Sequence, residues 1–141
     1  MMFDQSLIGT TSEPQTFTIT PEAVAKFIEA TGDPASTNVQ RDPSYVPLTF
    51  PTTFRIANPG LGLDGSKMQL IHGEQEYQYA RPLRVGETLT CVSRIVDIRE
   101  KTGRSGVMNF ITSEIEGRDI EGNVAFTGKS VLIVRPKRTE E

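Results

Sequence analysis

The sequence contains one cysteine, Cys91, and one histidine, His72. It has no apolar run near the roughly 20 residues that a membrane-spanning helix needs. A lone cysteine forms no intrachain disulfide and no cysteine-based metal site, which fits a reducing cytoplasm. A lone histidine without a nearby cysteine or a second histidine cannot complete the usual zinc ligand set. We therefore expect a cytoplasmic protein with no metal, no cofactor and no membrane span.

The chain also lacks an excess of basic residues. Its formal net charge is -3, which argues against nucleic-acid binding because a basic face dominates that affinity. Residues 1–6 show no basic segment followed by an apolar one, so we expect no secretory signal. The 141 residues, 36% of them hydrophobic, fit one domain with one core over 1–141. We expect a flexible tail at 136–141.

Residues 20–32 predict an amphipathic helix. Thr20 can cap its start, Pro21 suits the first helical position, and Gly32 tolerates the left-handed conformation common at helix ends. One face carries, at helical spacing, the residues Ala23, Val24, Phe27, Ile28 and Thr31. Four prolines then exclude a long regular element over residues 33–51. A second, short helix is expected within residues 52–57.

The rest of the chain predicts long antiparallel strands. A short strand at 17–19 precedes the helix, and glycine-containing turns separate four longer segments rich in β-branched residues, 70–80, 88–100, 107–116 and 123–134. Strands of about ten residues exceed the usual five or six. The pattern predicts an α+β fold in which a long antiparallel sheet wraps around the helix.

Three segments carry a resemblance to a known family: 30–38 (ATGDPASTN), 48–54 (LTFPTTF) and 71–87 (IHGEQEYQYARPLRVGE). The last is the most specific, because a strand leads into Arg-Pro-Leu and Val-Gly-Glu at a turn. Over almost its whole length the chain resembles MaoC-like hotdog-fold hydratases and dehydratases, of the N-terminal, FAS1-like dehydratase type. The resemblance implies a hotdog fold, a dimer or two fused hotdogs, and chemistry on enoyl or 3-hydroxyacyl thioesters.

Active members of that family carry Asp, and His five positions later, in the loop after the helix. Here Asp33 falls on the first position and Asn38 on the second. Asn cannot act as a general acid or base near neutral pH, although it can position a water or a carbonyl group. Active relatives hold the thioester oxygen on backbone N–H groups at the start of the central helix, where Pro51 offers none. The chain thus resembles the acyl-binding partner of a catalytic hotdog.

Each of these residues also has a simpler interpretation. Asp33 can be an ordinary acid in a turn, and Asn38 a loop residue that bonds its own backbone. Histidine is a common general base, so His72 can serve as a lone base, with Glu74 expected on the same strand face to orient the imidazole. Against this role, the segment around His72 resembles a strand at the dimer seam.

The candidate substrate-binding residues are Phe50, Thr52, Tyr77, Tyr79, Arg81 and Arg84. The two tyrosines share a strand face, and packing against other aromatic rings explains them better than an acyl tunnel does. Arginines 81, 84 and 104 match the phosphates of coenzyme A, but near turns they are more often surface charge.

Three functions stay open at this stage. The first is a hydro-lyase component for thioesters of coenzyme A or acyl carrier protein, as a homodimer or as a heterodimer with a catalytic MaoC-like subunit. The second is a non-catalytic acyl-CoA-binding module. The third, a thioesterase, is disfavoured because residues 48–57 contain no carboxylate.

Overall fold

The computed structural model describes residues 3–33, 42–56, 61–63, 65–104 and 106–137. In chain order the elements are η1 (Gln5–Leu7), β1 (Gln15–Thr18), α1 (Pro21–Thr31), η2 (Phe50–Thr53), β2 (Met68–Tyr79), β3 (Thr88–Gly103), β4 (Gly106–Arg118) and β5 (Val124–Pro136). The four predicted long strands and the predicted helix are all present, with strand ends moved by up to three residues.

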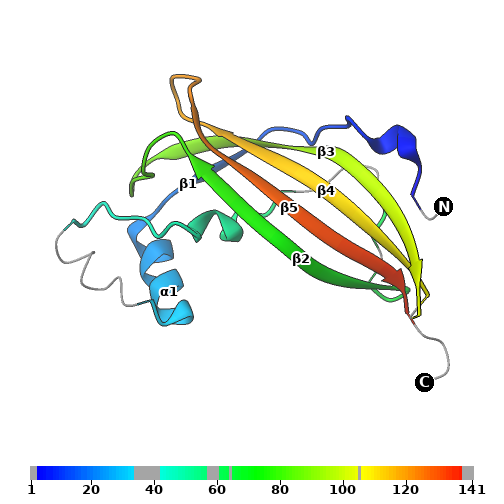
Figure 1. Ribbon diagram of the computed structural model, residues 1–141. Helices are drawn as coiled ribbons and strands as arrows, with labels where there is room; N and C mark the ends of the chain where they lie inside the picture. The colour runs from blue at the N-terminus through cyan, green and yellow to red at the C-terminus, as the bar shows by residue number, and fades with distance from the viewer. Residues whose placement is uncertain (1–2, 34–41, 57–60, 64, 105, 138–141) are drawn as a thin grey trace.

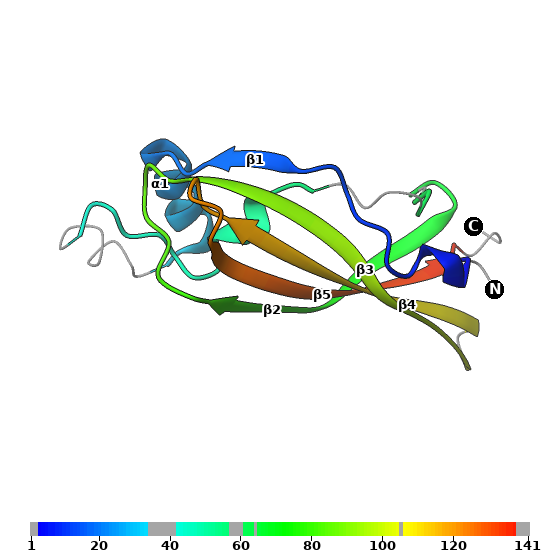
Figure 2. The ribbon, with the colours of Figure 1, turned by 90° about the horizontal axis from the view of Figure 1, so that it is seen from above.

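The strands form one curled antiparallel sheet in the order β1-β3-β4-β5-β2 (Figure 1). Its edges are β1, of four residues, and β2, of twelve residues. Seen from above, the sheet curves around η2, and α1 lies at one end of the sheet (Figure 2). This is the predicted α+β arrangement.

The local signals for α1 are confirmed. The Thr20 hydroxyl accepts a hydrogen bond from the Ala23 amide at 3.1 Å, which satisfies one of the free N–H groups at the helix start. Gly32 ends the helix with φ 65°, in the left-handed region that glycine enters without strain. Val24 is the fully buried residue of this helix.

The short helix expected within 52–57 is wrong in position and type. The structure has a 3-10 helix over Phe50–Thr53, and Phe54 already has an extended backbone. The Phe54 amide donates to the carbonyl of Pro51 at 3.0 Å, which is the tighter bonding pattern of a 3-10 turn. Pro51 suits the first turn of a helix, where its missing N–H costs nothing.

The core sits where α1 and the η2 segment meet the sheet. One cluster there joins residues of these segments to β3 and β5, namely Ile19, Val24, Val46, Phe50, Leu83, Leu89, Cys91, Ala125 and Phe126. A second cluster lies toward the other end of the sheet and contains Phe3, Leu61, Ile95, Ile98, Ile111 and Val134. The helices in the described part of the chain are all too short or too polar to reach across a membrane.

Candidate functional site

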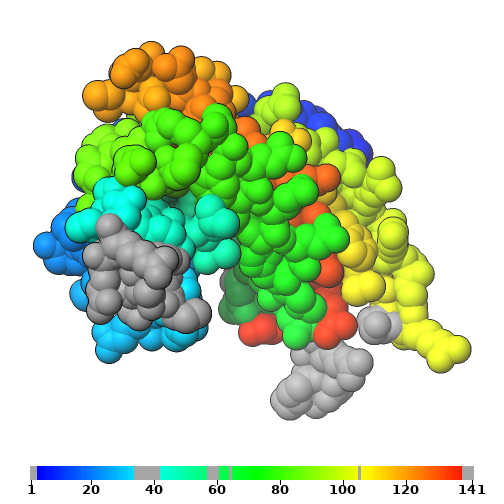
Figure 3. Space-filling view, turned by 60° about the vertical axis from the view of Figure 1, so that its left-hand side comes forward, coloured from blue at the N-terminus to red at the C-terminus, as the bar shows by residue number. Residues whose placement is uncertain are grey.

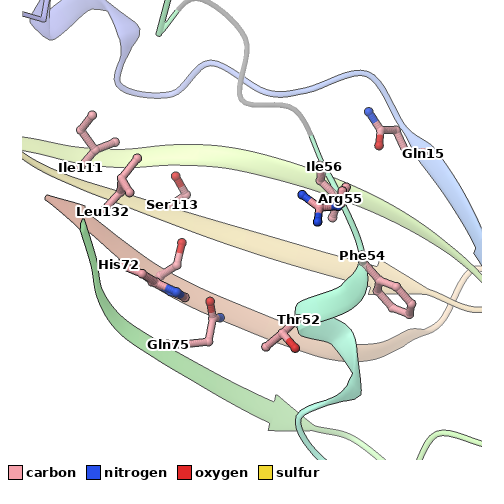
Figure 4. Close-up of a pocket in the computed structure, with 11 residues that line it drawn as sticks. Gln15, Thr52, Phe54, Arg55, Ile56, His72, Gln75, Ile111, Ser113 and Leu132 are labelled. Atoms are coloured by element: carbon pink, nitrogen blue, oxygen red, sulfur yellow. The ribbon is translucent and has the colours of Figure 1, made fainter. Parts of the chain in front are cut away.

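A pocket of about 660 Å³ opens inside the curl of the sheet, beneath η2 (Figure 4). Strands β2, β4 and β5 form its floor, η2 and the segment after it form its roof, and β1 closes one side. The described lining residues are His72, Gln75, Ile111, Ser113, Ser130 and Leu132 on the floor, Thr52, Phe54, Arg55 and Ile56 on the roof, and Gln15 from β1.

The strand register gives the floor two neighbouring rows of side chains. Gln75 lies opposite Ser130, which lies opposite Ser113, so one row is polar across three strands. In the next row, His72 lies opposite Leu132 and Ile111. The pocket therefore changes from polar to largely apolar over the distance between adjacent rows.

A β-bulge decides which β2 side chains reach the pocket. The pairing with β5 shifts between His72 and Glu74, and a bulge changes the alternation of side chains along a strand. As a result His72 and Gln75 line the same pocket, whereas Glu76 lines a separate hollow with Lys129. Glu74, next to Gln75 on a regular strand, faces away from the pocket.

The expected pairing of His72 with Glu74 is therefore wrong. His72 is exposed at the edge strand β2, and the described residues that line its pocket include no Asp or Glu. A carboxylate that orients this imidazole would have to come from elsewhere. Catalysis by His72 stays a prediction.

Asp33 directly follows the cap of α1. Its backbone amide donates to the Ile28 carbonyl at 3.2 Å, which continues the capping pattern of the helix end. It is not among the residues that line the pocket. Asn38 lies outside the described residues, so its relation to Asp33 stays a prediction.

Phe50 and Thr52 have different surroundings although both belong to η2. Phe50 is 2% exposed and meets Phe27 edge-to-face with centroids 5.5 Å apart, so it supports the roof from within the core. Thr52 lines the pocket, and its hydroxyl donates to the Thr49 carbonyl at 2.8 Å. Of the two, Thr52 can contact a ligand directly.

Tyr77 and Tyr79 pack around one ring of β5. Their ring centroids lie 6.2 and 6.1 Å from that of Phe126. Burial raises the pKa of each phenol to about 12, and the Tyr79 hydroxyl donates to the Leu48 carbonyl. This arrangement is the aromatic packing that the sequence favoured; binding of an acyl chain by either ring stays a prediction.

Arg81 is held by carboxylates at the turn after β2. Its guanidinium donates to both carboxylate oxygens of Glu87, at 2.6 and 3.0 Å, and to Asp119 at 3.2 Å. Burial opposes ionisation of Glu87, but hydrogen bonds from Arg81 and from the Arg84 amide outweigh it and hold the pKa of Glu87 below its usual range. The same Glu87 bonds raise the pKa of Arg81. These contacts tie the β2–β3 turn to the β4–β5 turn.

Arg84 lies at the same turn but is more exposed. Its guanidinium donates to the Ser44 hydroxyl at 2.8 Å and lies 3.6 Å from Asp42. Neither Arg81 nor Arg84 lines the pocket beneath η2. The binding of coenzyme A phosphates by these arginines stays a prediction.

Sequence reasoning missed most of the pocket. Gln75, Ser113 and Ser130 sit inside strands, where a polar residue is ordinarily assigned to the solvent face, and Arg55 follows η2 without any motif. Gly73 was the available signal, because a glycine inside a strand often marks a bulge. Within the described ranges, no group of three His, Cys, Asp or Glu residues could hold a metal ion.

The chain is similar to known proteins in sequence and fold. The model of the "FAS1-like, dehydratase domain region" family matches residues 6–128. A UPF0336 protein of Streptomyces coelicolor is 35% identical, and the match covers 96% of this chain and 97% of the relative.

Two solved structures share the fold at low identity. The HadBC (3R-hydroxyacyl-ACP dehydratase) complex from Mycobacterium tuberculosis superposes with a TM-score of 0.68 at 18% identity, covering 94% of this chain and 99% of that chain. A MaoC-like dehydratase superposes with a TM-score of 0.71 at 19% identity, covering 92% of this chain and 42% of that one. The predicted hotdog fold is confirmed, and with the family match over most of its length the chain belongs to the FAS1-like dehydratase domain family.

Proposed function

We propose that this protein is the acyl-binding component of a hydratase or dehydratase that acts on enoyl or 3-hydroxyacyl thioesters of coenzyme A or acyl carrier protein. The observation that carries the proposal is the composition of the pocket. It has the size of a small-molecule site and a floor that is half polar and half apolar, but its described lining contains no acid to pair with a base. Such a pocket can hold an acyl group, and the acid–base chemistry is left to a second subunit.

The free edge of the sheet supports a partner subunit. Among the described residues, strand β2 is paired on one side only, and the free edge of a twelve-residue strand is a template for another chain. His72 lies on this strand and in the pocket, so a subunit bound at β2 would stand next to the acyl group. The similar HadBC structure is a complex of a dehydratase, which fits a heterodimer; a homodimer is the alternative.

A non-catalytic acyl-CoA-binding module is the second candidate function. The absence of an acid from the described lining of the pocket favours it equally. A thioesterase is less well supported, because η2 and the segment after it offer no carboxylate over residues 50–56. Turnover in the presence of a partner separates a hydro-lyase component from a binding module.

The test is reconstitution with a MaoC-like subunit from the same genome that retains the Asp and His pair. The complex is isolated by size-exclusion chromatography, and hydration of enoyl-CoAs of increasing chain length is measured with the partner alone and with the complex. We expect the complex to have higher turnover and a chain-length preference that Thr52→Phe changes, because a ring at position 52 fills the pocket. Thr53→Phe, one residue outside the lining, is the matched control.

Two results would contradict the proposal. One is a partner whose activity and chain-length preference are the same with and without this protein. The other is a stable complex in which Thr52→Phe and Thr53→Phe behave alike, because the acyl group would then lie somewhere other than this pocket.

A further inference from the structure

Arg55 is a cation on the roof of the pocket that has no counterion among the described residues. It is exposed, and no described residue forms an ion pair or hydrogen bond with its guanidinium. Figure 4 shows the side chain pointing from the segment after η2 toward the floor strands. The positive charge of Arg55 is therefore available to a ligand bound in the pocket.

Two serine hydroxyls on the floor also have no hydrogen-bond partner in the described part of the chain. Ser113 and Ser130 lie opposite each other on β4 and β5, and neither hydroxyl is hydrogen-bonded to any described residue. Ser113 is 5% exposed. Its hydroxyl lines the pocket, and a hydrocarbon chain on this floor would cover that hydroxyl without giving it a hydrogen-bond partner, which is costly.

The remaining polar groups of the pocket are compatible with an anion. Gln75 extends the serine row on β2, with its side-chain amide 3.2 Å from the Lys129 carbonyl, and His72 lies in the next row. The described lining therefore offers a guanidinium, three hydroxyls, two amides and an imidazole, and no carboxylate that would repel a negative charge. A guanidinium fork and flanking hydroxyls match the two oxygens of a carboxylate.

We propose that the pocket selects acyl thioesters whose acyl group carries a second carboxylate, bound by Arg55 and the Ser113–Ser130 pair. The proposal rests on the proposed function, in that it names the class of acyl group that this component would hold. The apolar row of Ile111 and Leu132 would contact the methylene part of the same group.

The test compares two acyl thioesters of equal carbon number by titration calorimetry on the full chain. Adipyl-CoA carries a terminal carboxylate, hexanoyl-CoA carries a methyl group, and coenzyme A alone controls for its phosphates. Because a hydrogen bond to a charged group is stronger than one between neutral groups, we expect adipyl-CoA to bind at least about tenfold more tightly than hexanoyl-CoA.

Substitutions inside and outside the pocket test whether Arg55 and Ser113 cause the preference for adipyl-CoA. Arg55→Met keeps the length of the side chain without its charge and should abolish the preference, whereas Arg55→Lys should retain part of it. Ser113→Ala should reduce it by a smaller factor. Arg99→Met, a matched arginine that is exposed on β3 and does not line the pocket, should leave it unchanged, and thermal melts check that each variant is folded.

The outcomes separate this inference from the function on which it rests. Equal affinity for the two thioesters would overturn the carboxylate selection and leave acyl binding intact. Loss of affinity for coenzyme A alone in Arg55→Met would also overturn it, because Arg55 would then contact phosphate. Binding of neither thioester, by the chain alone or in its complex, would overturn the proposed function as well.

Discussion

His72 and Gln75 line the same pocket although they are three positions apart on β2. In a regular strand, residues three apart point to opposite faces. The register shift between His72 and Glu74 brings both side chains to the inside of the curled sheet, and Gly73 is the residue between them that lacks a side chain. A Cβ at position 73 would lie 3.1 Å from Cδ1 of Ile133 and 3.2 Å from the Val131 carbonyl oxygen.

Deletion of Gly73 should remove the bulge without turning β2 over. His72 and Glu74 pair with Leu132 and Val131, which are consecutive on β5, so the shortened strand should keep its register and its inner face. Gly73→Ala requires small movements of Ile133 and of the Val131 carbonyl and should cost about 1 kcal/mol of unfolding free energy. Urea unfolding of the two variants checks this; a deletion variant that does not fold would show that the extra residue is needed to set the face of β2.

Gly117→Ala should destabilise the protein by about 1–3 kcal/mol through overpacking. A Cβ at position 117 would fall 2.7 Å from Cδ1 of Phe126, the ring on which both tyrosines of β2 pack. Gly103→Ala is the control, because a Cβ there meets nothing within 4 Å. If the two alanine variants melt at the same temperature, the close approach of Gly117 to Phe126 is not important for stability.

Arg81→Met should lower the free energy of unfolding, and the difference from wild type should become smaller at acidic pH. Glu87 has a pKa below its usual value of 4.5, so its contribution is complete above pH 4.5 and disappears as the pH falls through the lowered pKa. We expect a loss of about 1 kcal/mol near neutral pH, a modest value because Arg81 is partly exposed. Urea unfolding at several pH values tests this.

Arg99→Met is the control for the unfolding measurements on Arg81→Met. Arg99 pairs with Asp97 on the surface, with its side chain 72% exposed, and pairs of this kind contribute little. Its replacement should have almost no effect at any pH. A stability difference between wild type and Arg81→Met that stays constant below pH 4.5 would contradict the assigned role of Glu87.

The free energy of unfolding should also fall at alkaline pH, because the phenols of two partly buried tyrosines ionise. Burial raises the pKa of Tyr77 and Tyr79 from 10.0 to about 12. Their contribution is therefore complete below pH 10 and is lost as the pH rises toward 12, because the unfolded chain releases these protons first. The Tyr77→Phe, Tyr79→Phe double variant should lose less stability over this interval, as measured by unfolding at successive pH values. An identical alkaline loss in both proteins would rule this out.

The sequence predicted the elements better than the faces they present. Capping at Thr20 and Gly32 and the glycine turns between β-branched segments are local signals, and the structure confirms the helix and strands that they mark. The pocket depends on two features that are not local. The bulge at Gly73 reverses the alternation on β2, and the pairing of Ser113 with Ser130 exists only once β4 and β5 are in register.

The candidate site residues were also predicted less well than the helix and strands. Thr52, a candidate substrate-binding residue, lines the pocket, whereas Phe50, two residues earlier, is buried in the core. A 3-10 turn places these neighbours on different sides, and the expected helix within 52–57 did not anticipate it. Arg55 has no motif, and its proposed role rests on the pocket that it lines together with Ser113 and Ser130.

The most direct test of the central claim is hydration of a panel of enoyl-CoAs by the purified, folded protein without any partner, for wild type, Asp33→Ala and His72→Ala. If the protein is an acyl-binding component, wild type alone shows no turnover above the rate without protein. Turnover by wild type that is lost in Asp33→Ala or in His72→Ala would contradict the account, because the chain would then be an enzyme with its own acid or base.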